Sequence, residues 1–157
     1  MKKLVLILPF AALAACTEQP GLFGNTTGTP ATATPTPTLD PTPPPPPPSD
    51  ARTVDQFDTT SEEDRQAAVT VEASGGARSL GTTIASLGPP TEPGIWMKTP
   101  LVSELTPGRV AYQGTEINVE LRPSGGAAGS GSQISLAAMR LLNAPLTGLP
   151  EVEVFAR

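Results

Sequence analysis

The chain of 157 residues contains no histidine, a single cysteine and only six aromatic residues, which are four Phe, one Tyr and one Trp. Imidazole is the usual general base near neutral pH and the commonest metal ligand, so its absence argues against most hydrolase and metalloenzyme designs. The 20 prolines and 15 glycines argue against one uniform globule, because segments rich in them lack the apolar mass that offsets chain entropy. The sequence divides instead into an apolar head, a Pro/Thr-rich middle and a more ordinary back half.

Basic residues are also scarce. The chain has ten Lys and Arg and fifteen Asp and Glu, which gives a formal net charge of −5. Removal of residues 1–15 would take away Lys2 and Lys3 and no acid, so the remaining chain would carry −5 − 2 = −7. An acidic chain is repelled by phosphate backbones, and we therefore expect no nucleic-acid partner.

Residues 1–15 have the layout of a secretory signal peptide. A basic start precedes an apolar run from Leu4 to Phe10 and several alanines. The run is shorter than the roughly 20 apolar residues that a transmembrane helix needs. The lone cysteine, Cys16, follows directly at the end of "LAAC".

This "LAAC", Leu13 to Cys16, resembles the lipobox of bacterial lipoproteins. The resemblance implies that Cys16 begins the mature protein and carries a diacylglyceryl thioether and an acylated amine, which bind the lipid bilayer without a spanning helix. In such lipoproteins an aspartate directly after the cysteine retains the protein at the inner membrane. Here the residue after the cysteine is Thr17, which favours the outer membrane and a domain that faces the periplasm. The alternative is an ordinary signal peptide with an incidental thiol.

Residues 16–52 have the composition of a disordered linker between anchor and domain. The stretch from Thr17 to Asp50 has no Lys or Arg and contains six consecutive prolines, Pro43 to Pro48. Proline removes amide donors and fixes φ, which leaves polyproline II and a reach of up to about 100 Å. Two alternatives are a docking site for a Pro-binding groove and Thr-linked glycosylation.

Residues 53–157 are enough for one small domain. Short apolar stretches between turn signals predict an α+β, mostly β fold with one or two short helices. We expect strands in "SLGTTIASLG", over Ile95 to Val102, in "RVAY" after a turn at Thr106 to Gly108, and over Glu151 to Ala156.

The clearest strand is "EINVELR", Glu116 to Arg122. Its apolar residues alternate with polar ones, which predicts one face in the core and one face in solvent. The expected core residues are Ile117, Val119 and Leu121, and the expected solvated row is Glu116, Asn118, Glu120 and Arg122.

Two helices are predicted from their caps. Thr60 with Glu63 three residues later has capping-box spacing, which indicates a helix from Ser61 to about Val69. Ser132 or Ser135 can cap a second, buried helix in "SQISLAAMRLL".

The Gly-rich "PSGGAAGSGS", Pro123 to Ser132, invites comparison with a phosphate-binding loop. Ser132 and Gln133 stand where a P-loop needs its lysine and its Mg-binding hydroxyl. We therefore expect a flexible linker here and no nucleotide.

The strand, Gly-rich loop, "ISLAAMRLL" helix and closing strand, behind a lipobox and a Pro-rich tether, resemble the RlpA-type (rare lipoprotein A) envelope lipoproteins over about residues 108–156. The resemblance implies a small double-psi β-barrel in the cell envelope. Lytic members of that family use an acid and a histidine. This chain has no histidine and reads "VELRPSGG" where the family has an Asp-Arg-Gly-Pro turn, so only the fold and the compartment carry over.

The blocks "TTIASLG", "EPGIWMKTPLV" and "GSQISLAAMRLL" are similar to short proteobacterial lipoproteins that carry the label D-galactarate dehydratase. Sugar-acid dehydratases rely on metal ligands, and this chain offers no histidine, no cysteine beyond Cys16 and no clustered carboxylates. The residues give the label no support, and we expect neither a metal nor a cofactor.

The leading hypothesis is a non-catalytic envelope binding or assembly module, with peptidoglycan or another envelope protein as partner. Trp96, Lys98 and Tyr112 are the candidate binding residues, because aromatic faces stack on sugars and peptides. The alternative for Trp96 is a place in the core. The alternative is an envelope enzyme, either a glycan-cleaving barrel or the labelled dehydratase. Its acid–base pair would come from the carboxylates of Glu92, Glu104 and Glu120.

Overall fold

The computed structural model describes residues 39–40, 42–71 and 77–157. All of them belong to one compact unit, Pro35–Arg157, and the chain's other unit is Met1–Thr34. The predicted signal peptide, Cys16 and the part of the predicted tether before Leu39 lie outside the described residues.

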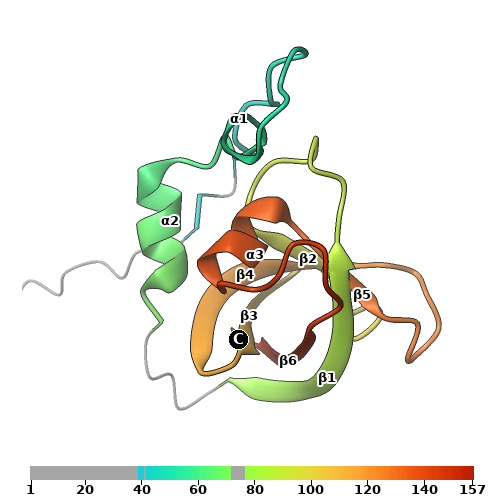
Figure 1. The fold of residues 1–157 in the computed structure, drawn as a ribbon. Helices are drawn as coiled ribbons and strands as arrows, with labels where there is room; N and C mark the ends of the chain where they lie inside the picture. Colours follow the sequence, from blue (N-terminus) through green and yellow to red (C-terminus); the bar gives the residue numbers. More distant parts are fainter. Residues whose placement is uncertain (1–38, 41, 72–76) are drawn as a thin grey trace, which may run out of the picture. The chain divides into compact units, whose positions relative to one another are not determined.

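The domain is built on a closed six-stranded barrel (Figure 1). Its strands are β1 (Arg78–Leu87), β2 (Trp96–Thr99), β3 (Thr106–Tyr112), β4 (Thr115–Pro123), β5 (Ser132–Ile134) and β6 (Glu151–Ala156). Around the barrel they follow the order β1, β5, β2, β4, β3, β6. The last strand, β6, pairs antiparallel with both β1 and β3 and thereby closes the sheet. The prediction of a mostly β fold with a small barrel is confirmed.

Two of the strand pairs are parallel, β1 with β5 and β2 with β4. The other pairs are antiparallel. In the β2–β4 pair Trp96 lies beside Glu120 and Lys98 beside Arg122. This register brings together polar side chains that are more than twenty positions apart in the sequence.

Strand alternation supplies the core as predicted. Ile117, Val119 and Leu121 of β4 are buried, and so are Val152 and Val154 of β6. Side chains from β1, β2, β3, β5 and the C-terminal helix complete the same apolar cluster.

The predicted turn at Thr106 to Gly108 is wrong, because these residues begin β3 and pair with β4. A Cβ atom at Gly108 would lie 2.3 Å from Cδ1 of Leu121, so glycine is required here for close packing rather than for a turn. The chain turns instead at Gln113 and Gly114, whose φ angles are 48° and 85°. Two successive positive φ angles suit a two-residue hairpin that follows the strand twist.

The second predicted helix exists as α3 (Leu136–Leu141), and Ser135 is its cap. Ser135 Oγ accepts the N–H groups of Ala138, at 3.3 Å, and of Trp96, at 3.2 Å. The other candidate cap, Ser132, belongs to β5. Ser135 therefore ties the start of α3 to β2.

The first predicted helix exists as α2 (Glu62–Val69), but its cap is Ser61 and not Thr60. Ser61 Oγ accepts the N–H of Asp64 at 3.0 Å. A further short helix that the sequence did not predict, α1 (Val54–Phe57), precedes α2 and is capped by Thr53. Among the described residues, no helix has the length and apolar content to cross a membrane.

Helix α2 packs on the outer side of β4, where the sequence predicted a solvated row. Asn118 Nδ2 donates to the carbonyl oxygen atoms of Ala67, at 3.1 Å, and Thr70, at 3.0 Å. Only 5% of Asn118 is exposed. The solvated-row prediction is therefore wrong for this residue, because the C-terminal carbonyls of a helix need donors and Asn118 supplies them.

The described part of the Pro-rich stretch lies against the domain. The carbonyl of Pro45 accepts a hydrogen bond from Thr59 Oγ1 at 2.6 Å, and Pro44 Cδ lies 3.5 Å from where a Cβ of Gly94 would stand. Leu39 packs against the core cluster. We name residues 39–40 and 42–48 the strap. The compact unit thus begins before residue 53, where the sequence placed the domain boundary.

We predict that Asn118→Ala lowers the free energy of unfolding by about 1–2 kcal/mol, because two hydrogen bonds to α2 are lost and each contributes about 1 kcal/mol. Amide hydrogen exchange in α2 should accelerate at the same time. Gln133→Ala, which removes an exposed amide from β5, is the matched control and should change neither quantity. An unchanged exchange rate in α2 of Asn118→Ala would contradict the anchoring role.

Candidate ligand-binding pocket

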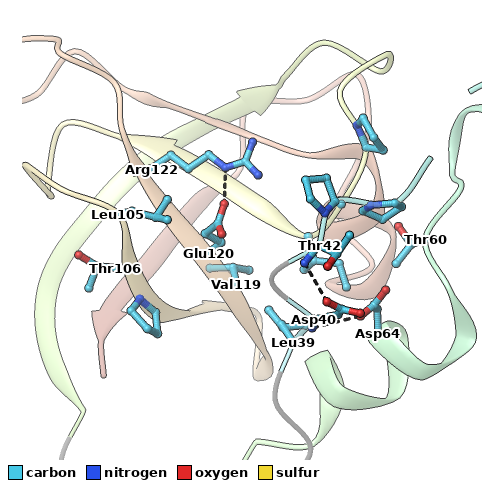
Figure 2. A pocket seen from close by; sticks show the side chains of 16 residues that line it. Leu39, Asp40, Thr42, Thr60, Asp64, Leu105, Thr106, Val119, Glu120 and Arg122 are labelled. Atoms are coloured by element: carbon cyan, nitrogen blue, oxygen red, sulfur yellow. Dashed lines mark hydrogen bonds and ion pairs between the residues drawn. The ribbon is translucent and has the colours of Figure 1, made fainter. Parts of the chain in front are cut away.

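A cavity of about 380 Å³ lies between the strap, the start of α2 and the strands β3 and β4 (Figure 2). Its lining is mostly apolar, with Leu39, Pro43, Pro44, Pro93, Gly94, Ile95, Leu105, Pro107 and Val119. The polar lining residues are Asp40, Thr42, Thr60, Asp64, Thr106, Glu120 and Arg122. An apolar cavity of this size with a few polar groups is typical of small-ligand sites.

The outer row of β4 supplies the polar residues on the barrel side of this cavity. Beyond Asn118 the row continues with Glu120 and Arg122, whose side chains are half-buried. Arg122 Nε contacts Glu120 Oε1 at 2.5 Å, as Figure 2 shows. The side chains of Arg122 and Glu120 are 26% and 32% exposed, so the prediction of a fully solvated row is wrong for this pair as well.

Arg122 also belongs to a wider ion-pair network. Its Nη1 contacts Glu92 Oε1 at 2.8 Å, and the second carboxylate oxygen of Glu92 accepts from Lys98 Nζ at 2.7 Å. Glu92 thus bridges a cation from β4 and a cation from β2. Single exposed ion pairs contribute little, but a half-buried network with good geometry holds its side chains in place.

The indole of Trp96 lies beneath this network and is 0% exposed. Its Nε1 donates to the Glu92 carbonyl at 3.2 Å, and a Cβ at Gly88 would stand 2.5 Å from its ring. Lys98 Nζ and Arg122 Cζ lie 4.9 and 5.3 Å from the ring centroid. No face of the indole is free to stack on a sugar, so the predicted binding role of Trp96 is wrong. Trp96 instead supports the two cations.

Tyr112 is far from Trp96 and Lys98. It pairs with Thr115 at the hairpin end of β4, whereas Trp96 pairs with Glu120, five residues further along. At the rise of a β-strand this separation is about 17 Å. The structure therefore brings Trp96 and Lys98 together but does not bring Tyr112 to them, and the three predicted residues do not form one site.

Two of the three candidate catalytic carboxylates, Glu92 and Glu120, meet at the Arg122 guanidinium. Glu104 is not part of the cavity lining. In these ion pairs Glu92 and Glu120 act as hydrogen-bond acceptors, whereas the general acid of a glycosidase must donate a proton. Within residues 39–40, 42–71 and 77–157, no group of three or more Asp, Glu, Cys or His is placed to hold a metal ion.

The Gly-rich loop borders a second cavity of about 710 Å³. Residues 124–130 are exposed, in line with a linker, but Ser132 is buried in β5. Its hydroxyl donates to Thr99 Oγ1 at 2.9 Å and shares a hydrogen bond of 3.0 Å with Thr83 Oγ1. The last residue of the predicted linker thus joins three strands, β1, β2 and β5.

Sequence reasoning missed five polar residues of the first cavity, which are Asp40, Thr42, Thr60, Asp64 and Thr106. Asp40 was part of the predicted tether, and Thr60 was the predicted helix cap. Thr60 and Ser61 are equivalent in sequence, because each hydroxyl precedes an acid three residues later. Ser61 is the observed cap, so the Thr60 hydroxyl takes no part in capping α2.

Comparison with family models, curated proteins and solved structures gave no match to this chain. The resemblances to RlpA-type lipoproteins and to the lipoproteins labelled D-galactarate dehydratase therefore stay predictions. Cys16 lies outside the described residues, and its lipidation stays a prediction as well.

We predict that Arg122→Met shifts the fluorescence of Trp96, the only tryptophan, to longer wavelength. The methionine side chain keeps part of the packing. It removes the guanidinium that faces the indole and that lies between the carboxylates of Glu92 and Glu120. The free energy of unfolding should fall by about 1–2 kcal/mol, which is less than for a fully buried ion pair.

Arg78→Met, at an exposed position of β1, is the control for this variant and should leave the emission maximum unchanged. An identical spectrum in Arg122→Met and the unmodified protein would refute the contact between Arg122 and the indole.

Proposed function

We propose that this protein is a lipid-anchored lipoprotein of the outer membrane whose barrel faces the periplasm as a non-catalytic binding or assembly module. The anchor is supported by the sequence around Cys16, where a signal-peptide layout ends in "LAAC". The binding role is supported by the cavity beneath the strap. The partner we propose is peptidoglycan or another envelope component.

The single observation that carries the binding role is the composition of this cavity. Its walls are apolar side chains and prolines, and its few polar groups come from the strap, from the start of α2 and from β4. Sites for small ligands combine a concave apolar surface with a small number of fixed polar groups. The ion-pair network of Arg122 fixes one such group, and the cap of α2 fixes another.

The docked strap also limits where a partner can be. Between Cys16 and Leu39 the chain has 22 residues. At roughly 3.1 Å per residue they reach about 70 Å, compared with about 100 Å for the whole stretch that the sequence assigned to the tether. The proposed module therefore serves partners that lie within this shorter distance of the bilayer.

We predict that Cys16→Ser abolishes acylation and removes the protein from the outer-membrane fraction. The thiol is the atom that would carry the diacylglyceryl group, and serine offers none. Intact-mass measurement should show acyl groups on the unmodified protein and none on the variant, which should also keep residues 1–15.

Thr17→Ser is the matched control, since it places the same residue one position later and leaves the cysteine. It should be acylated and sorted like the unmodified protein. An unmodified protein without acyl groups, or a Cys16→Ser variant of unchanged mass and location, would refute the proposed anchor.

A further inference from the structure

Burial along the strap has a period of three residues. Pro44 and Pro47 are half-buried, whereas the other five residues between 42 and 48 are exposed. Consecutive prolines favour the polyproline II helix, in which three residues make one turn and every third residue lies on the same side. An unattached spacer would show no such period, because solvent would surround all of its residues equally. The strap therefore turns one side of a polyproline helix toward the domain.

The domain offers this side of the strap what a run of prolines can use. A proline has a carbonyl acceptor but no N–H, so a surface that binds consecutive prolines must supply donors and room for the rings. Thr59 supplies a donor, since its Oγ1 lies 2.6 Å from the carbonyl oxygen of Pro45. Gly94 supplies room, since Pro44 Cδ lies 3.5 Å from where its Cβ would stand.

The donor is held in place by contacts that do not involve the strap. Thr59 follows Asp58, whose side chain is 3% exposed and lies between two guanidinium groups. Asp58 Oδ2 is 2.8 Å from Arg140 Nη1 on α3 and 3.3 Å from Arg65 Nη2 on α2. These ion pairs join the segment between α1 and α2 to both longer helices. A donor that is positioned before binding lowers the entropic cost of binding.

We propose that this face of the domain is a polyproline-recognition surface and that its ligand is the chain's own strap, which docks reversibly. Apart from the turn at Pro48, two hydrogen bonds between described residues join the strap to the domain. The second, from the Asp40 N–H to Asp64 Oδ1, is 3.4 Å long. So few bonds suit a segment that docks and leaves without unfolding the barrel.

Reversible docking would give the tether two lengths. The docked strap leaves a reach of about 70 Å and the released strap about 100 Å. This inference goes beyond the proposed binding role of the cavity and does not depend on a ligand there.

The test adds a fluorescein-labelled peptide with the sequence of residues 42–50, "TPPPPPPSD", to the full chain in a non-ionic detergent. Fluorescence anisotropy measures its binding. In the unmodified chain the strap occupies the surface at a high effective concentration, so the peptide should bind weakly. In the double variant Pro44→Ala/Pro47→Ala the strap loses both half-buried rings, and we expect the peptide to bind at least about tenfold more tightly.

The double variant Pro45→Ala/Pro48→Ala is the matched control. It makes the same two changes one position later, at exposed rings, and it keeps the carbonyl that Thr59 bonds. This chain should bind the peptide as weakly as the unmodified one. Hydrogen-exchange protection of β4 should be the same in both double variants, which would show that the barrel is intact.

Peptide variants test whether the phase of the helix is recognised. On the Pro44→Ala/Pro47→Ala chain, a peptide with alanine at these same two positions should bind at least about tenfold more weakly than the strap peptide. A peptide with alanine at the positions of Pro45 and Pro48 should bind like the strap peptide.

A third change tests the donor. Thr59→Val, introduced into the Pro44→Ala/Pro47→Ala chain, should weaken binding of the strap peptide about fivefold, the factor that corresponds to one hydrogen bond. Thr82→Val, at an exposed position of β1, makes the same replacement away from the strap and should leave the affinity unchanged.

The inference is overturned if the Pro44→Ala/Pro47→Ala chain binds the strap peptide no more tightly than the unmodified chain. It is also overturned if the two alanine peptides bind equally, because the surface would then not recognise the phase of the helix. Equal affinities of the Thr59→Val and Thr82→Val chains would remove the donor. None of these results would affect the proposed anchor, which is decided by the mass of Cys16→Ser.

Discussion

The two-residue period of β4 is the constraint on which the rest of the domain depends. Because Ile117, Val119 and Leu121 enter the core, the residues between them must face outward, and a shift of one position would exchange the two rows. Asn118 then meets the carbonyls of α2, while Glu120 and Arg122 reach the cavity. Since Asn118 positions α2, it also determines where the residues at the start of that helix lie. One strand register therefore arranges a helix, an ion-pair network and a cavity.

Most strands and both longer helices could be predicted from the sequence, because alternation and capping are local signals. The choice of Thr60 over Ser61 as the cap of α2 failed because the two are locally equivalent. The other failures below share one physical cause, which is that burial and close packing depend on distant segments. The Pro-Gly pair at Pro107 and Gly108 has the composition of a turn, but Leu121 from another strand requires glycine there. The outer row of β4 has the composition of a solvated face, but α2 covers Asn118. Trp96 has the side chain of a stacking surface, but in the structure the segment with Gly88 and Glu92 covers it.

The cavity could not be predicted from the sequence either, because its lining also depends on distant segments. Its lining comes from the strap, from the residues around Thr60, from the turn before β2 and from β3 and β4, and no spacing in the chain connects these segments. The Pro-rich composition was interpreted as a spacer because proline cannot join helices or sheet interiors. Because it stays outside helices and sheets, a Pro-rich segment is available to line a cavity. A polyproline segment has little conformational entropy to lose when it docks, and its carbonyls accept hydrogen bonds, as that of Pro45 does from Thr59.

The position of the strap links the proposed anchor to the proposed ligand. Leu39 and Asp40 are lining residues of the cavity and also the described residues nearest to Cys16 along the chain. A ligand in the cavity would contact the strap and the barrel together, and a docked strap would in turn complete the ligand's site. Because docking of the strap and binding of the ligand are thermodynamically coupled, each favours the other by the same factor. Tension on the end that we propose to be lipid-anchored would act on the strap before it acts on the barrel, because β1 to β6 all follow the strap in sequence. Anchor extension and ligand release would therefore be coupled through two residues of the strap.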